Sequence, residues 1–135
     1  MKRIVLMILS LALVASAWAQ PSRQEAYTEI KAIDKLYQQA LSNIHGHRAT
    51  GIDIDRFRQA DEKANRLISR LEDGYGASIK NPLWVCRSAI IYLQQARYMQ
   101  WATANTGHPK DETKHLDTYQ VSEALGMVKD CGDSR

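Results

Sequence analysis

Four histidines are the side chains of this sequence best suited to metal chemistry. His45 and His47 lie in one predicted loop and His108 in another, and carboxylates follow closely in the chain: Asp53, Asp55, Asp111 and Glu112. Imidazole and carboxylate groups gathered at one end of a domain can bind zinc or copper. No spacing here matches a recognised metal motif, and each residue also suits an ordinary loop or capping role. We therefore expect no cofactor, and keep His45, His47 and His108 as an alternative metal site.

The sequence carries no motif that would support catalysis. It contains no nucleophile elbow, glycine-rich phosphate loop, HExxH or CxxC pattern, and without CxxCH it cannot attach haem covalently. The aspartates and glutamates fall at predicted helix starts or on polar faces, which does not select a catalytic pair. We expect a protein that is not an enzyme.

The first nineteen residues have the pattern of a cleaved signal peptide. Lys2 and Arg3 precede an apolar run over residues 4–14, and Ala17-Trp18-Ala19 forms a small-x-small cleavage site. The apolar run is shorter than the roughly 20 residues that a membrane-spanning helix needs, and no cysteine lies near the cleavage site to carry a lipid. We therefore expect residues 1–19 to be removed, no membrane anchor, and a periplasmic protein.

Cys86 and Cys131 are the two cysteines of the chain. In an oxidising compartment an even count favours a disulfide over a metal site or a catalytic thiol. We therefore expect one bond between them. It would close a loop of about 45 residues and be worth roughly 4 kcal/mol in the chain-entropy model.

The mature chain is nearly neutral and suits a single domain. Removing the leader takes away two of the eighteen basic residues and none of the fifteen acidic ones, which leaves a net charge of +1. Binding to nucleic acid needs a concentrated basic face, so no nucleic-acid partner is expected. The length of residues 20–135 suits one domain with one core.

Four helical patterns follow one another in the mature chain. Helix signals place them from Ser22 to about His45, from Asp53 or Asp55 to about Gly74, from Asn81 to Asn105, and from Pro109 to Cys131. Apolar residues spaced by three and four define core stripes in the first two: Ala26, Ile30, Ile33, Tyr37, Ala40 and Ile44, then Phe57, Ala60, Ala64, Leu67 and Leu71. The fourth pattern has a less regular apolar side: Leu116, Val121, Ala124, Leu125 and Val128.

Short loops between four helices predict an all-α, up-down-up-down four-helix bundle. In that topology the first turn of the third helix and the end of the fourth lie at the same end of the bundle. Cys86 and Cys131 occupy these two positions, so the expected disulfide agrees with the topology. The loops that hold the histidines lie at the opposite end.

The third helical pattern is apolar on two sides. A broad arc predicted to face the core contains Val85, Cys86, Ala89, Ile90, Tyr92, Leu93, Ala96 and Met99. A second stripe, Trp84, Ile91 and Tyr98, repeats every seven residues, with Arg87 and Gln94 at its edge. Such a helix is either central in its own domain or buries one side against another chain. Aromatic side chains are favoured at interface hot spots, so these five residues are the predicted partner-binding site.

Binding to another protein is the function that these features favour. Small exported helical domains with one disulfide often act as inhibitors, immunity proteins, chaperones or adaptors, although a fold does not establish a function. We expect an exported, periplasmic, non-catalytic protein that binds a protein partner, as an inhibitor or immunity protein against a toxin or hydrolase. Two alternatives stay open. One is a metal-binding or metal-handling bundle that uses the histidine end, and the other is a homodimer in which the second stripe completes the core.

Overall fold

All regular secondary structure in the described part of the chain is α-helical. The computed structural model describes residues 20–42, 44, 49–76, 78–106 and 110–133, without the side chains of residues 105–106 and 110–118. Its helices are α2 (Arg23–Ser42), α3 (Gly51–Leu71), α4 (Trp84–Thr106) and α5 (Lys110–Gly132). The predicted all-α fold with one disulfide is therefore confirmed. Over the residues described, none of these helices combines the length and the apolar character that crossing a membrane requires.

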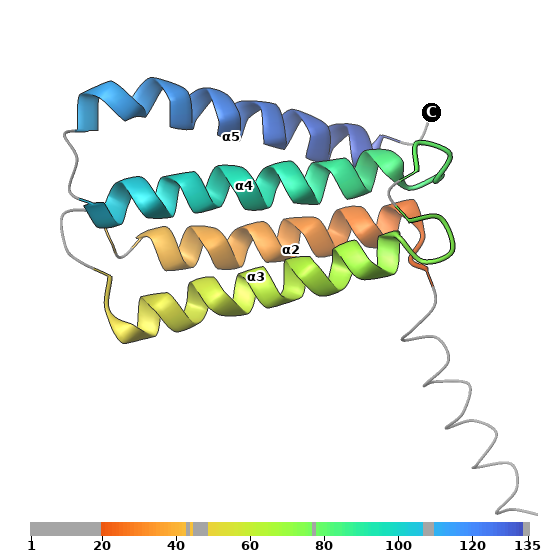
Figure 1. Cartoon of the computed structure of the whole chain (residues 1–135), viewed down its shortest axis with the longest axis horizontal. Coiled ribbons are helices and arrows are strands. Elements are labelled where there is room, and N and C mark those ends of the chain that lie inside the picture. The colour runs from red at the N-terminus through yellow and green to blue at the C-terminus, as the bar shows by residue number, and fades with distance from the viewer. Residues whose placement is uncertain (1–19, 43, 45–48, 77, 107–109, 134–135) are drawn as a thin grey trace, which may run out of the picture.

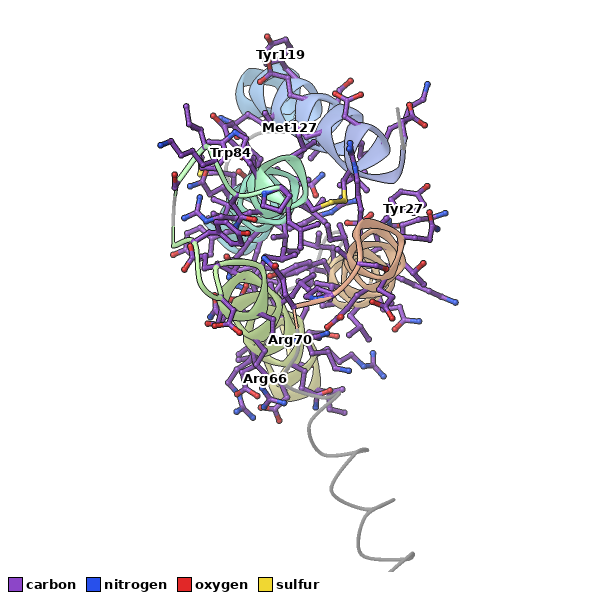
Figure 2. All side chains as sticks on the ribbon, turned by 90° about the vertical axis from the view of Figure 1, so that its right-hand side faces the viewer. Tyr27, Arg66, Arg70, Trp84, Tyr119 and Met127 are labelled. Carbon is purple, nitrogen blue, oxygen red and sulfur yellow. A yellow bond between two sulfur atoms is a disulfide. The ribbon has the colours of Figure 1, made fainter. Side chains whose placement is uncertain are left out.

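Consecutive helices run in opposite directions (Figure 1). α3 packs on α2 and α4, and α5 packs on α4 and α2, so the four helices close into a bundle. Seen along the helices, α2 and α4 lie next to each other, with α5 on one side of this pair and α3 on the other (Figure 2). The helical bundle expected from the apolar patterns is the observed arrangement.

Reciprocal capping contacts determine where the first two helices begin. The Ser22 N–H donates to Glu25 Oε2 (2.7 Å) and Ser22 Oγ accepts from the Glu25 N–H (3.1 Å), as predicted. The hydrogen bond from the Ser22 N–H first, and the Ser22 side chain second, lower the pKa of the Glu25 carboxyl. The prediction that Asp53 or Asp55 caps α3 is wrong, because Thr50 is the N-cap. Its Oγ1 accepts from the Asp53 N–H (3.4 Å) while its own N–H donates to Asp53 Oδ2 (3.1 Å), so Asp53 closes a second capping box.

Two glycines reverse the chain after α3. Gly74 and Gly76 have φ angles of 77° and 58°, in the left-handed region that glycine adopts without strain. The predicted glycine-rich turn is therefore present, but α3 itself already ends at Leu71, with Glu72 as its C-cap. α2 ends at Ser42. The predicted end of the first helix at His45 and Gly46 lies outside the described residues.

Asn81 connects the end of α3 to the start of α4. Its Oδ1 accepts from the Leu83 N–H (2.9 Å), and its Nδ2 donates to the Leu71 carbonyl (2.6 Å). The predicted cap is therefore present, but α4 begins at Trp84 and not at Pro82. The reason is a turn after Asn81, in which the Trp84 N–H donates to the Asn81 carbonyl (2.9 Å).

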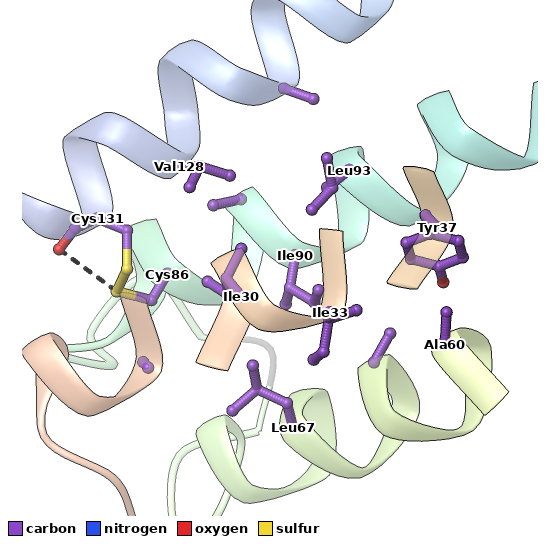
Figure 3. Packing of buried hydrophobic residues seen from close by; sticks show 14 of the residues in the cluster. Ile30, Ile33, Tyr37, Ala60, Leu67, Cys86, Ile90, Leu93, Val128 and Cys131 are labelled. Atoms are coloured by element: carbon purple, nitrogen blue, oxygen red, sulfur yellow. Dashed lines mark hydrogen bonds between the residues drawn. A yellow bond between two sulfur atoms is a disulfide. The ribbon is translucent and has the colours of Figure 1, made fainter. Parts of the chain in front are cut away.

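The predicted apolar stripes build the core (Figure 3). The buried residues of α2 and α3 are Ala26, Ile30, Ile33, Tyr37, Ala40, Phe57, Ala60, Ala64, Leu67 and Leu71, and Ile44 is buried beyond α2. α4 and α5 add Cys86, Ala89, Ile90, Leu93, Ala96, Ala124, Val128 and Cys131. Val121 is partly buried against this cluster, and the side chain of Leu116 lies outside the described residues. Burial of each large aliphatic side chain stabilises the fold by roughly 1.5–3 kcal/mol.

Part of the α4 arc predicted to face the core faces outward. Val85, Tyr92 and Met99 are exposed by 37%, 47% and 45%. α2, α3 and α5 together cover the arc of α4 that carries Cys86, Leu93 and their buried neighbours, and Val85, Tyr92 and Met99 lie beyond its edge. Residues seven apart share nearly the same direction on a helix, so these three side chains turn outward together. Leu125 of α5, also predicted as apolar core, is 42% exposed because the buried side of that helix follows Ala124 and Val128.

A disulfide joins the first turn of α4 to the last turn of α5, and hydrogen bonds join the start of α2 to the same end of α5. Cys86 and Cys131 form the predicted disulfide, with their Cα atoms 4.7 Å apart. Arg23 donates through Nε to the Cys131 carbonyl (2.7 Å) and through Nη2 to the Asp130 carbonyl. A cation at a helix C-terminus satisfies free carbonyls and is favoured by the helix dipole.

Candidate functional site

The outward surface of α4 is the candidate site, and we call it the α4 face. It is formed by Trp84, Val85, Ser88, Ile91, Tyr92, Gln95, Tyr98 and Met99. Tyr98 is the most exposed of its large side chains, at 58%. Figure 2 shows Trp84 on the side of the bundle opposite Tyr27 of α2. Contiguous exposed apolar surface of this kind marks interaction sites in soluble proteins.

The α4 face contains no charged residue. Between Trp84 and Ala104 the only charged residues are Arg87 and Arg97, and each is paired with a carboxylate outside α4: Glu72, the C-cap of α3, and Asp34 of α2. Arg87 Nε donates to Glu72 Oε1 (2.6 Å), and its guanidinium carbon lies 5.5 Å from the centroid of the Trp84 ring. The described side chains of α4 therefore present no unpaired charge to solvent.

The predicted partner-binding residues Trp84, Ile91 and Tyr98, which we call the partner stripe, all reach this surface. Trp84 and Ile91 are partly buried, and Tyr98 is exposed. The stripe is therefore not absorbed into the core of a single chain. Its role in binding stays a prediction.

The two predicted edge residues of the partner stripe are held against α3. Arg87 is paired with Glu72, and Gln94 Nε2 donates to Asn65 Oδ1 (3.1 Å) and to Asp61 Oδ1 (3.3 Å). Both side chains thus fix the position of α4 on its neighbour. Arg87 and Gln94 therefore border the partner stripe and also hold the helix that carries it in place.

A shallow groove lies between the other side of the α4 face and α5. Its volume is about 400 Å³, and its lining residues are Tyr92, Gln95, Ala96, Tyr98, Met99, Gln120 and Glu123. Glu123 is the charged residue of this lining, and its Oε1 accepts a hydrogen bond from the Tyr119 hydroxyl (3.0 Å). Tyr92 and Met99, which the sequence placed in the core, are thus part of the candidate surface.

A buried ion pair joins α2 to α4 beneath this surface. Arg97 donates through Nε to Asp34 Oδ1 (2.7 Å) and through Nη2 to Asp34 Oδ2 (3.1 Å), and the two side chains are only 8% and 10% exposed. Gln38 donates to Asp34 (2.7 Å), and Arg97 donates to Gln100 (2.8 Å). Each charge is matched and further hydrogen-bonded, so the pair holds α4 in position and leaves no free acid or base here.

Neither member of this pair was predicted from the sequence, although each interrupts an apolar stripe. Asp34 lies four residues after Ile30, and Arg97 lies four residues after Leu93, so both fall on the inward sides of their helices. A charged residue on a buried arc requires an opposite charge. One acidic and one basic interruption in two facing helices is the signal that would have found the pair.

Tyr37 brings a second polar contact into the core. Its side chain is fully buried, its hydroxyl donates to Asp61 Oδ1 (2.5 Å), and its ring packs edge-on against Phe57 with centroids 5.0 Å apart. Trp101 of α4 continues this aromatic cluster, 4.5 Å from the Phe57 ring. Burial first, and the Asp61 carboxylate second, raise the pKa of Tyr37 far above the usual value for tyrosine. The hydroxyl therefore acts as a permanent hydrogen-bond donor at neutral pH.

The alternative metal site falls where the structure gives no description. His45, His47 and His108 all lie outside the described residues. Among the residues that are described, no three histidine, cysteine, aspartate or glutamate side chains are grouped to hold a metal ion. The metal hypothesis stays a prediction, and stoichiometric metal that is retained by the wild type and lost after substitution of all three histidines would support it.

Comparisons with protein families, with curated proteins and with solved structures found no match for this chain. The geometry described above therefore carries the functional argument. The chain presents an uncharged, partly aromatic surface on α4, and two ion pairs and a disulfide fix this helix to the rest of the bundle.

Proposed function

We propose that this chain is an exported, periplasmic, non-catalytic protein that binds a protein partner through the α4 face. In this proposal it acts as an inhibitor or immunity protein against a toxin or hydrolase. Trp84, Ile91 and Tyr98 supply the central contact, and Arg87 and Gln94 lie at its edge. The exposed, uncharged surface of α4 is the observation that carries the proposal.

The composition of the α4 face supports a role in protein binding. Tryptophan and tyrosine are enriched among the residues that dominate interface energies, and charged residues are depleted at interface centres. A helix that is apolar on its outer side as well as its inner side has a second surface to bury. α4 has both properties, because its core arc is covered by the other helices while Tyr98 and its neighbours remain exposed.

The rigidity of α4 also supports the proposal. The disulfide holds its first turn to α5, Arg87 holds it to α3, and Arg97 holds it to α2. A surface that is already ordered loses less conformational entropy when a partner binds. The α4 face can therefore contribute affinity without first rearranging.

The leader-like pattern and the disulfide support an exported location. The first nineteen residues combine a basic start, an apolar run and a small-residue cleavage site. Structural disulfides persist in oxidising compartments such as the periplasm. Mass spectrometry of the protein recovered from the periplasmic fraction tests both points, with a mature N-terminus at or near Gln20 as the expected result.

Affinity capture tests the binding proposal. The oxidised chain from Gln20 to Arg135 serves as bait for periplasmic and secreted proteins, beside a Trp84→Ala, Tyr98→Ala double variant. We expect the wild type to capture one dominant protein and the double variant to lose it. A captured toxin or hydrolase whose activity falls when the wild-type chain is added would establish the inhibitory role.

Tyr75→Ala provides the matched control, because this tyrosine is 48% exposed in the turn after α3, outside the α4 face. The control variant should capture the same protein as the wild type. Equal capture by the wild type and the Trp84→Ala, Tyr98→Ala variant would remove α4 from the interface. A folded wild type that captures nothing would count against the proposal as a whole.

A further inference from the structure

The side of the α4 face next to α5 carries a second stripe, formed by Val85, Tyr92 and Met99, which we call the α5-side stripe. We propose that a second copy of the chain covers this stripe, so that the protein forms a two-fold symmetric dimer through α4. The proposal goes beyond the proposed function, whose central contact is the neighbouring partner stripe of Trp84, Ile91 and Tyr98. Four features of the α4 face support it: its exposed apolar side chains, its lack of charge, its polar groups that both donate and accept, and its seven-residue spacing.

The α5-side stripe is apolar and unpartnered within the chain. Val85, Tyr92 and Met99 keep 37%, 47% and 45% of their surface exposed, although they lie on the same helix as the most enclosed core residues. The groove beside α5 borders this stripe, and Glu123 on its α5 side is the charged residue of its lining. The α5-side stripe itself is what a second apolar helix would cover.

The surface also lacks the charge that would keep two identical copies apart. A surface with an excess of one charge sign repels an identical copy, which opposes self-association. The outward side of α3 is predominantly basic, with Arg56, Arg58, Lys63 and Arg66 exposed beside Glu62, and Figure 2 shows Arg66 on the outer side of the bundle. The α4 face has no such residue, because Arg87 and Arg97 are paired within the chain.

The polar groups of the α4 face can pair with copies of themselves. A two-fold interface places the same patch on both sides, so each patch must be complementary to itself. The hydroxyls of Ser88 and Tyr92 and the amide of Gln95 can each donate and accept a hydrogen bond. Every polar group on this surface can therefore find a partner in a second copy, which a lone carboxylate or ammonium group could not.

The spacing of the stripe suits the packing of two helices against each other. A seven-residue repeat keeps apolar side chains on one line along a helix, which is the pattern of helix pairs. From Val85 to Met99 this line is about 21 Å long at 1.5 Å per residue. Tyr92 is its middle residue, so in a dimer whose stripes are in register it meets its own counterpart whether the second helix runs parallel or antiparallel.

Sedimentation or light scattering of the oxidised chain from Gln20 to Arg135, over a micromolar concentration series, measures the association directly. The wild type is expected to have the mass of two copies, and to dissociate on dilution. Tyr92→Glu and Tyr92→Lys are each expected to raise the dimer dissociation constant at least roughly tenfold, because like charges then meet at the symmetry axis. Tyr75→Glu, which adds the same charge away from α4, should leave the dissociation constant unchanged.

Mixing the two charged variants provides the decisive result. Glutamate on one copy would face lysine on the other, so an equimolar mixture of Tyr92→Glu and Tyr92→Lys should form a heterodimer at a concentration where each variant alone is mainly monomeric. Helical circular dichroism of each variant confirms that it is folded. A mixture that stays monomeric would overturn the proposal, as would a wild type that is monomeric throughout the series. A monomeric wild type that still captures a partner through Trp84 and Tyr98 would leave the proposed function intact.

Discussion

Tyr37 shows how a single buried hydroxyl links stability to pH. Burial and the neighbouring Asp61 raise the pKa of Tyr37 in the folded protein, whereas tyrosine in an unfolded chain ionises near pH 10. The folded state therefore holds its proton where the unfolded state loses it. This contribution to stability is complete below about pH 10 and decreases as the pH rises above that value.

Replacing Tyr37 by phenylalanine should remove this pH dependence. We expect Tyr37→Phe to be less stable than the wild type by about 1 kcal/mol at neutral pH, because a buried hydrogen bond to Asp61 is lost. Between about pH 9 and pH 11 the free energy of unfolding should fall less steeply for the variant than for the wild type. Urea unfolding at several pH values measures both quantities, and parallel pH profiles for the two proteins would contradict the assignment.

Removing one member of the buried Asp34–Arg97 pair should destabilise the protein strongly, whereas replacing both by apolar residues should destabilise it much less. Arg97→Met leaves a carboxylate in the core, so we expect a loss of roughly 3–5 kcal/mol. The double variant Asp34→Leu, Arg97→Met removes both charges and should recover most of that loss. Thermal or urea unfolding of the wild type, the two single variants Asp34→Leu and Arg97→Met, and the double variant gives the coupling between the two residues. Additive losses would mean that the pair does not act as a unit.

At the scale of single helices, α5 offers two glycines with opposite expected behaviour. A Cβ atom at Gly126 would meet nothing within 4 Å, but one at Gly132 would lie 2.9 Å from two carbons of the Tyr27 ring. Gly126→Ala should therefore stabilise the protein by up to about 1 kcal/mol, since alanine favours a helix over glycine. Gly132→Ala should destabilise it, because the ring must move away from the core it packs against.

Unfolding temperatures of the two alanine variants test this contrast, and each serves as the control for the other. The opposite signs depend on the docking of the α5 end against α2. A stabilising effect at both positions would show that the Tyr27 ring does not restrict Gly132 in solution.

For α4, the local sequence predicts the helix but not which of its sides is buried. The Asn81 cap, the apolar composition and the approximate length were predicted from the sequence. The exposure of Tyr92 and Met99 was not. An apolar arc wider than the space between three neighbouring helices leaves some of its members outside. The periodicity alone does not say which members these are.

At the scale of the whole molecule, the disulfide should supply a large part of the stability. Cys86 and Cys131 are 45 residues apart in the chain, and closing a loop of about that length is worth roughly 4 kcal/mol. We expect a lower unfolding temperature for the wild type in the presence of a reducing agent. A Cys86→Ser, Cys131→Ser variant should unfold at a similarly low temperature with or without the reductant. Equal stability of oxidised and reduced wild type would contradict this account.

The sequence by itself determined the features that depend on neighbours in the chain. Capping pairs such as Ser22 and Glu25, the glycine turn after α3, and the spacing of apolar residues in α2 and α3 are local, and they defined four helices. The pairing of Cys86 with Cys131 followed because only two cysteines are present and the alternating topology brings them together. The number of helices and their order along the bundle were therefore predictable.

Only the tertiary structure decided which apolar surface of α4 is left uncovered and which distant charges meet. Asp34 and Arg97 are 63 residues apart, and nothing local joins them. Tyr92 was assigned to the core because it lies within the predicted arc, but the positions of the neighbouring helices leave it about half exposed. Helix periodicity specifies angles around one axis, whereas burial depends on where the other axes lie. That is why the helices could be read from the sequence and the candidate binding surface could be read only in part.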